Sequence, residues 1–142
     1  MSSVKVRSVL AGIDLFSTLD DDALSQIEQS GTTFTTGAGG KVIAEGSSDS
    51  GLRILLDGSA AVDVGGESRG EVNAGDYVGE ISAIDGEPRS ASLTAGPDGC
   101  TTFAISSLQL TPLVRSNPDI AVALLKTLSA RLRKVEAAAA KS

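Results

Sequence analysis

The sequence predicts a mainly β fold, an antiparallel β-roll of the jelly-roll or double-stranded β-helix type, with helices at both ends. Short β-prone runs fill residues 32–105, and turn residues interrupt them about every ten positions. Helical patterns lie on either side, at 3–30 and 106–140. A chain of 142 residues can bury one core of its own, so we expect 1–142 to form a single domain.

The N-terminal region predicts two helices joined by an apolar connection. A short amphipathic segment covers 4–10, and a second helix is expected between Asp20 and Gly31. The Asp20 carboxylate can cap that helix, and acidic residues in its first turn suit the helix dipole. Three adjacent acids at a helix start point in different directions, which favours capping over metal binding. The apolar residues expected to face the core are Ile13, Leu15, Phe16, Leu24 and Ile27.

The middle of the chain predicts the strands of the roll. Each run is rich in β-branched or apolar residues and is closed by Gly, Asp, Asn or Ser. Most glycines here are expected in turns, where they adopt positive φ without a Cβ penalty. The predicted strands are 32–36, 41–44, 52–56, 59–64 and 69–72, with returning strands at 91–95 and 101–105.

Two helices are predicted after the roll. Ser106 can cap a short helix that carries Leu108, Leu110, Leu113 and Val114. Asn117 and Pro118 then have the order of an N-cap and a first helical residue, which starts a helix through residue 140. The apolar residues of this helix repeat in steps of three, four and three, and such a stripe needs a surface to pack on. It consists of Leu125, Leu128, Leu132 and Val135, and the residues alone leave open whether it packs on the roll or on a partner.

The composition argues against several functional classes. The net charge is −6, from 18 acidic and 12 basic residues without a basic run, so we expect no nucleic-acid surface. Histidine is absent and Cys100 is the single cysteine, which removes His–Cys zinc sites and His-dependent nucleophiles. We therefore expect no metal. No apolar run approaches the roughly 20 residues that span a bilayer, and the first residues do not form a signal peptide, so a soluble cytoplasmic protein without membrane contact is expected.

Polar groups of several kinds converge between residues 79 and 91, inside apolar flanks. The apolar residues Val78, Ile81 and Ile84 have the spacing of one face of a short helical turn. A helix N-terminus near Glu80 would favour an anion, and Arg89 could pair with the same anion. The Glu80 carboxylate needs hydrogen-bond donors beside it, such as hydroxyl groups. The pattern therefore predicts a sugar phosphate or nucleotide as ligand.

These residues carry a family resemblance. Gly-Glu-Ile-Ser at 79–82 and Pro-Arg-Ser-Ala at 88–91 resemble the phosphate-binding cassette of cyclic nucleotide-binding domains. This module is the sensor of catabolite activator protein-like regulators and of cyclic AMP-dependent protein kinase regulatory subunits. The resemblance extends to Glu45-Gly46, to 58–62 and to 74–76, and so covers nearly the whole chain.

The resemblance implies a role for each matching residue. Glu80 would accept the ribose 2′-hydroxyl, Arg89 would pair with the cyclic phosphate, and Ser90 would add a hydroxyl to the phosphate or the purine. The remaining ligand contacts would be backbone groups of Gly79, Ile81, Ser82 and Ala91, with Val72 and Arg131 as base or lid contacts.

The resemblance also implies a function. The chain is expected to be a stand-alone sensor, not an enzyme, that binds 3′,5′-cyclic AMP, with cyclic GMP as the alternative ligand. The C-terminal helix would cover the base and form part of a homodimer contact. No helix-turn-helix follows that helix, so an unknown partner protein would supply the output.

Some residues depart from the family pattern. Ser82 stands where Ala is common, and Ala83 stands where many relatives have a Leu that packs against the lid, with Ile84 as the replacement contact. Arg53 stands where an aromatic residue is usual. One alternative is therefore a degenerate member that serves as a dimerisation or adaptor module. A cupin-like enzyme on a similar roll is a second alternative, but it would need histidine metal ligands that this chain lacks.

Overall fold

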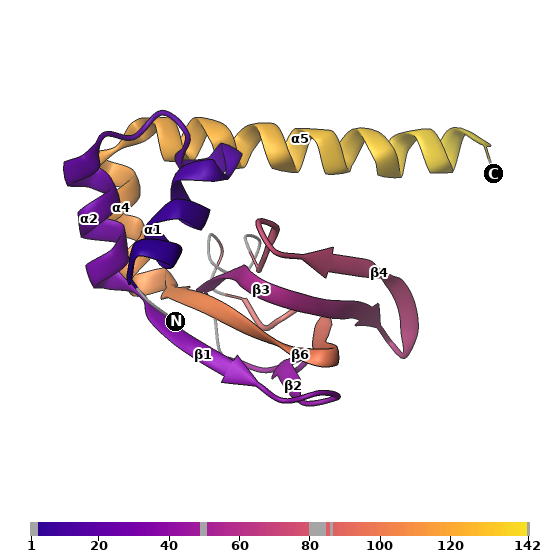
Figure 1. The fold of residues 1–142 in the computed structure, drawn as a ribbon. Coiled ribbons are helices and arrows are strands. Elements are labelled where there is room, and N and C mark those ends of the chain that lie inside the picture. Colours follow the sequence, from indigo (N-terminus) through magenta and orange to yellow (C-terminus); the bar gives the residue numbers. More distant parts are fainter. Residues whose placement is uncertain (1–2, 49–50, 80–84, 86, 142) are drawn as a thin grey trace.

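Helices flank a region of antiparallel strands, which confirms the predicted fold class (Figure 1). The computed structural model describes residues 3–48, 51–79, 85 and 87–141. The helices are α1 (Ser3–Gly12), η1 (Asp14–Phe16), α2 (Asp21–Ser30), α4 (Ser107–Ser116) and α5 (Pro118–Lys141). The strands are β1 (Thr32–Thr36), β2 (Lys41–Ile43), β3 (Gly51–Val64), β4 (Glu67–Asn73), β5 (Tyr77–Val78) and β6 (Ser92–Ser106).

Side-chain caps fix where two of the helices begin. The Asp20 carboxylate accepts a hydrogen bond from the Ala23 N–H at 2.9 Å, as predicted. Ser106 and Gln109 form a reciprocal capping box at the start of α4. Helix α5 begins at Pro118 directly after Asn117, as predicted, but the Asn117 side chain points back: its nitrogen donates to the Leu113 carbonyl at 3.1 Å. Asn117 therefore closes the end of α4, while its own carbonyl accepts from the Ile120 N–H.

Two long strands organise the sheet. Strand β6 pairs with β1, β2 and β3, and β3 pairs in turn with β4 and β5, always antiparallel. The prediction of separate strands at 52–56 and 59–64, and at 91–95 and 101–105, is wrong. Gly58 does not end a strand. It bends one at a register shift with φ of +81°, where a Cβ would lie 2.9 Å from the Cys100 Cα.

Strand β3 separates two hydrophobic cores. Successive side chains of a strand point to opposite faces, so Ile54 and Leu56 belong to one core and Leu55 to the other. The larger core joins the strands to the helices and includes the predicted residues Ile13, Leu15, Phe16, Leu24 and Ile27. The smaller core fills the roll and consists of Ile43, Leu55, Ala60, Leu93, Ala95 and Cys100.

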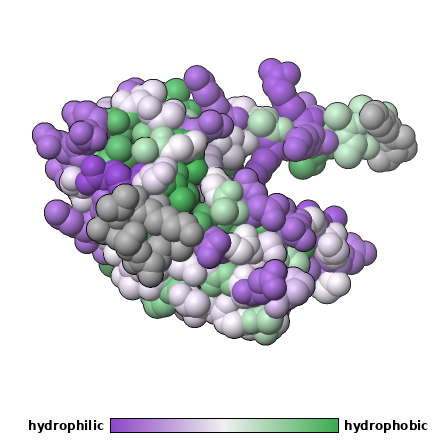
Figure 2. Space-filling model, viewed as in Figure 1, coloured by the Kyte–Doolittle hydropathy of each residue, from purple (hydrophilic) through white to green (hydrophobic). Residues whose placement is uncertain are grey.

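Helix α5 is anchored at its beginning and exposed beyond it. Ile120 and Leu124 are buried, whereas every residue from 129 to 140 is exposed. Figure 2 shows this end of the helix projecting from the body of the molecule, with open space beneath it. Leu125, Leu132 and Val135 are 63%, 58% and 64% exposed, so this part of the stripe does not pack on the roll.

Candidate functional site

The short strand β5 leads into the predicted cassette. Val78 pairs with Arg53 in the sheet, so it does not belong to the helical turn in which the sequence placed it. Gly79 follows with φ of +87°. A Cβ at this position would overlap the Arg89 Nη1 atom and lie 2.5 Å from the Gly51 carbonyl oxygen. Glycine therefore meets two requirements here, a left-handed backbone and the close approach of a guanidinium.

Arg89 is held in place at both its backbone and its side chain. Its N–H donates to the Ser47 carbonyl at 2.9 Å, and its own carbonyl accepts from the Gly46 N–H at 2.8 Å. The side chain is only 5% exposed, and its Nη1 donates to the Gly51 carbonyl at 2.6 Å. A guanidinium that is held in a fixed position can form charge-assisted hydrogen bonds to an anion. The position therefore suits the binding of an anion.

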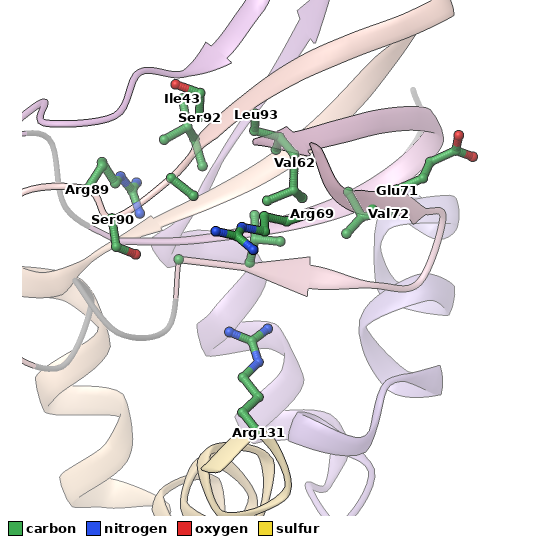
Figure 3. Close-up of a pocket in the computed structure, with 14 residues that line it drawn as sticks. Ile43, Val62, Arg69, Glu71, Val72, Arg89, Ser90, Ser92, Leu93 and Arg131 are labelled. Carbon is green, nitrogen blue, oxygen red and sulfur yellow. The ribbon is translucent and has the colours of Figure 1, made fainter. Parts of the chain in front are cut away.

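A cavity of about 380 Å³ opens beside Arg89 (Figure 3). Three arginines from different segments border it: Arg69 on β4, Arg89, and Arg131 on α5. In Figure 3 Arg131 extends from α5 toward β4, and the Glu71 carboxylate points away from the arginines. The other lining residues are Ile43, Val62, Gly70, Glu71, Val72, Val78, Gly79, Ser90, Ala91, Ser92 and Leu93. Apolar walls with several guanidinium groups suit a ligand that has an apolar ring and an anionic group.

The structure brings together all of the predicted site residues that it describes. These six line this one cavity: Val72, Gly79, Arg89, Ser90, Ala91 and Arg131. The predictions for Glu80, Ile81 and Ser82 lie outside the described residues, as do those for Ala83 and Ile84. The ribose contact and the cassette helix therefore stay predictions.

The family model of the cyclic nucleotide-binding domain matches residues 35–117, which span the roll, the cassette and α4. The chain belongs to this family. The domain is 28% identical over 138 residues to a cAMP-dependent protein kinase regulatory subunit of Colletotrichum trifolii, covering 88% of this chain and 34% of that protein. It is 33% identical over 89 residues to a cGMP-dependent protein kinase of Toxoplasma gondii, covering 63% of this chain and 9% of that protein. The chain thus spans only part of the length of either relative.

A solved structure has the same fold. It is the N-terminal domain of a transcriptional regulator from Streptomyces coelicolor A3(2), with a TM-score of 0.71 and 28% identity. The similarity covers 89% of this chain and 94% of that one. The cavity beside Arg89 is therefore part of a cyclic nucleotide-binding domain.

Several residues that line the cavity of this domain were not predicted from the sequence. Ser92 and Leu93 lie at the start of β6, directly after the cassette, and the Ser92 Oγ accepts from the Glu45 N–H at 3.0 Å. Their place after Ala91, at the start of a predicted strand, was a usable signal. Arg69 had none, because a charged residue on a predicted strand is most simply interpreted as facing solvent.

Arg53 packs its guanidinium on an aromatic ring of strand β1. Its guanidinium lies 4.9 Å from the centre of the Phe34 ring, and its Nη1 donates to the Thr102 Oγ1 at 3.1 Å. The cation therefore packs on a ring at the sheet surface. Nearby, burial in the smaller core raises the pKa of the Cys100 thiol, and the positive charge of Arg53 partly opposes this rise.

The described part of the chain has neither a cluster of metal-ligating side chains nor a membrane-spanning helix. No group of three or more Cys, Asp or Glu side chains in this part of the chain could hold a metal ion. No helix within the same residues combines the length and hydropathy needed to cross a bilayer.

Proposed function

We propose that this domain is a sensor for a 3′,5′-cyclic nucleotide, with cyclic AMP as the first candidate and cyclic GMP as the alternative. The observation that carries the proposal is the burial of Arg89 at the end of a cavity where Gly79 leaves room for its guanidinium. A guanidinium carries several N–H groups, so one that donates to the Gly51 carbonyl can also donate to a phosphate.

The ligand is oriented by the two ends of the cavity. Its phosphate binds at Arg89 and Gly79, with Ser90 beside it, and Glu80 accepts the ribose hydroxyl. The base lies against Val72 and under Arg131, where an apolar wall and a guanidinium suit the face of a purine. The name of the Colletotrichum relative supports cyclic AMP, and that of the Toxoplasma relative supports cyclic GMP.

The domain is regulatory rather than catalytic in this proposal. It acts as one unit over 1–142 and passes its bound state through α5 to a partner. The exposed residues Leu125, Leu132 and Val135 offer a surface for a second copy of the chain or for another protein. The same exposure favours a second candidate function, an adaptor or dimerisation module, if the cavity takes no nucleotide.

Titration calorimetry with cyclic AMP, cyclic GMP and non-cyclic 5′-AMP tests the ligand. We expect one of the cyclic nucleotides to bind more tightly than 5′-AMP. Arg89→Ala should lose about 2 to 5 kcal/mol of binding free energy, which abolishes measurable binding, because a buried anion loses its charge partner. Arg89→Lys keeps a charge without the planar guanidinium and should bind with an intermediate affinity.

The matched control is Arg115→Ala, which removes an exposed arginine from the last turn of α4. It should bind like the wild type. Urea unfolding of each variant separates lost binding from lost folding. Wild-type affinity in folded Arg89→Ala would mean that Arg89 does not hold the ligand. A wild-type chain that binds neither cyclic nucleotide would favour the adaptor function.

A further inference from the structure

A side-chain hydrogen bond joins the roll to α5 close to the cavity. The Tyr77 hydroxyl on β5 lies 2.6 Å from the Thr127 Oγ1 on α5. Tyr77 also packs its ring against the larger core, so the hydroxyl is presented from a fixed base. We refer to this hydrogen bond as the Tyr77–Thr127 latch.

The latch lies where α5 leaves the body of the molecule. Thr127 and Leu128 are half-buried, and every residue from 129 to 140 is exposed. The latch therefore contacts the last anchored turn, and the exposed part of the helix starts directly after it. The direction of that exposed part depends on how firmly this turn is held.

Strand β5 carries the latch at one end and the phosphate end of the cavity at the other. Tyr77 pairs with Ile54, Val78 pairs with Arg53, and Gly79 follows directly beside the Arg89 guanidinium. The side chains of the strand alternate, so Tyr77 packs on the larger core and Val78 on the smaller one. This short strand therefore connects the ligand site mechanically to α5.

Arg131 lies four residues after Thr127, one helical turn further along the same face of α5. It borders the cavity beside Arg89, and Figure 3 shows it extending from α5 toward β4. It also borders a second hollow of about 380 Å³, which Asp14 and Asp76 line as well. A turn held less firmly would let its guanidinium move toward these carboxylates and away from the ligand.

We propose that Tyr77 and Thr127 are positioning residues for the ligand site, because their hydrogen bond holds the turn of α5 that places Arg131 over the cavity. The inference rests on the proposed function. It adds that this hydrogen bond holds part of the lid in position. The hydrogen bond lowers the cost of ordering that turn when the ligand binds, and this preorganisation is lost when either hydroxyl is removed.

The test uses the full chain and substitutions that keep the shape of each side chain. Tyr77→Phe keeps the ring in the core, and Thr127→Val keeps the branched side chain. Each should weaken binding of the nucleotide that the wild type prefers by about two- to tenfold, the range expected for one hydrogen bond. The double variant should bind the nucleotide no less tightly than the weaker-binding single variant, because the two substitutions remove the same hydrogen bond.

Arg131 provides the readout that separates positioning from general stability. In the Arg131→Ala background, Tyr77→Phe should change affinity less than twofold, because the residue that the latch positions is gone. Thr111→Val is the matched control, since the Thr111 hydroxyl donates within α4, to the Ser107 carbonyl at 3.1 Å. It should bind with wild-type affinity. An equal effect of Tyr77→Phe with and without Arg131 would overturn the proposal.

Hydrogen exchange of the ligand-free chain tests the latch without any nucleotide. Amides between 128 and 135 should exchange faster in Tyr77→Phe than in the wild type, and at the wild-type rate in Thr111→Val. Unchanged exchange in Tyr77→Phe would also overturn the proposal. A wild-type chain that binds neither cyclic AMP nor cyclic GMP would instead refute the proposed function, and this exchange measurement alone would then decide whether the latch holds α5.

Discussion

Replacing Gly79 by alanine tests how the cavity is built. The residue has φ of +87°, which costs an L-amino acid about 1 to 2 kcal/mol. The new Cβ would also overlap the Arg89 Nη1 atom and approach the Gly51 carbonyl oxygen to 2.5 Å. Overpacking of this kind costs about 1 to 3 kcal/mol. We therefore expect Gly79→Ala to lower the free energy of unfolding by about 2 to 5 kcal/mol.

Gly66→Ala is the matched control, because it has the same backbone strain without the collision. Gly66 has φ of +83°, and a Cβ there would meet no atom of the described residues within 4 Å. Gly66→Ala should lower the free energy of unfolding only by the cost of the left-handed backbone, about 1 to 2 kcal/mol. The difference between the two variants in urea unfolding then isolates the contact between Gly79 and Arg89.

Ligand binding provides the second measurement on the same pair of variants. Gly79→Ala should displace the Arg89 guanidinium and so lose nucleotide affinity about as Arg89→Ala does, whereas Gly66→Ala should bind like the wild type. Both are measured by calorimetry at a temperature where each variant is folded. Equal stability and equal affinity of the two alanine variants would refute the view that Gly79 makes room for the guanidinium.

Three further predictions follow from the site and the fold. Glu80→Gln should weaken binding less than Arg89→Ala. The wild type should bind 2′-deoxy cyclic AMP more weakly than cyclic AMP, whereas Glu80→Gln should bind the two almost equally. If the losses from the substitution and from the missing hydroxyl simply add, Glu80 does not contact the ribose hydroxyl. Cyclic AMP should raise hydrogen-exchange protection between 123 and 135, and truncation after Leu124 should lower affinity; no change in either would exclude α5 as a lid. The raised pKa of Cys100 means that folding favours the protonated thiol. The thiol's contribution to the free energy of unfolding is therefore complete below its pKa in the unfolded chain and is lost as pH rises through its pKa in the folded chain. If the free energy of unfolding of Cys100→Ala falls by the same amount at alkaline pH, this prediction is wrong.

Local signals in the sequence predicted the helices better than the strands. Asp20 and Ser106 are caps whose side chains act on neighbouring N–H groups, so their role depends on nearby residues alone. Gly58 was misinterpreted as a strand end, because glycine marks turns and bulges alike. Here the backbone near Cys100, more than 40 positions away in the sequence, packs against Gly58, and this contact makes Gly58 a bend within a strand and not a turn.

The candidate site was predictable where one contiguous motif carries it. Gly79, Arg89, Ser90 and Ala91 all lie between residues 79 and 91 and line one cavity. Arg69 comes to the same cavity from β4, and only the pairing of strands shows that it does. The Tyr77–Thr127 contact joins residues 50 positions apart, and neither residue type predicts the other.

The central position of β6 has a consequence for how the chain folds as it is synthesised. Strands β1 and β2 have no sheet neighbour other than β6 among the described residues, and β3 pairs with β6 along most of its length. Until residue 106 has left the ribosome, these strands expose unpaired edges. Closing such long loops is slow, as in other folds dominated by pairing between distant segments. We therefore expect the roll to form late and cooperatively, so that fragments that stop short of β6 should be prone to aggregate.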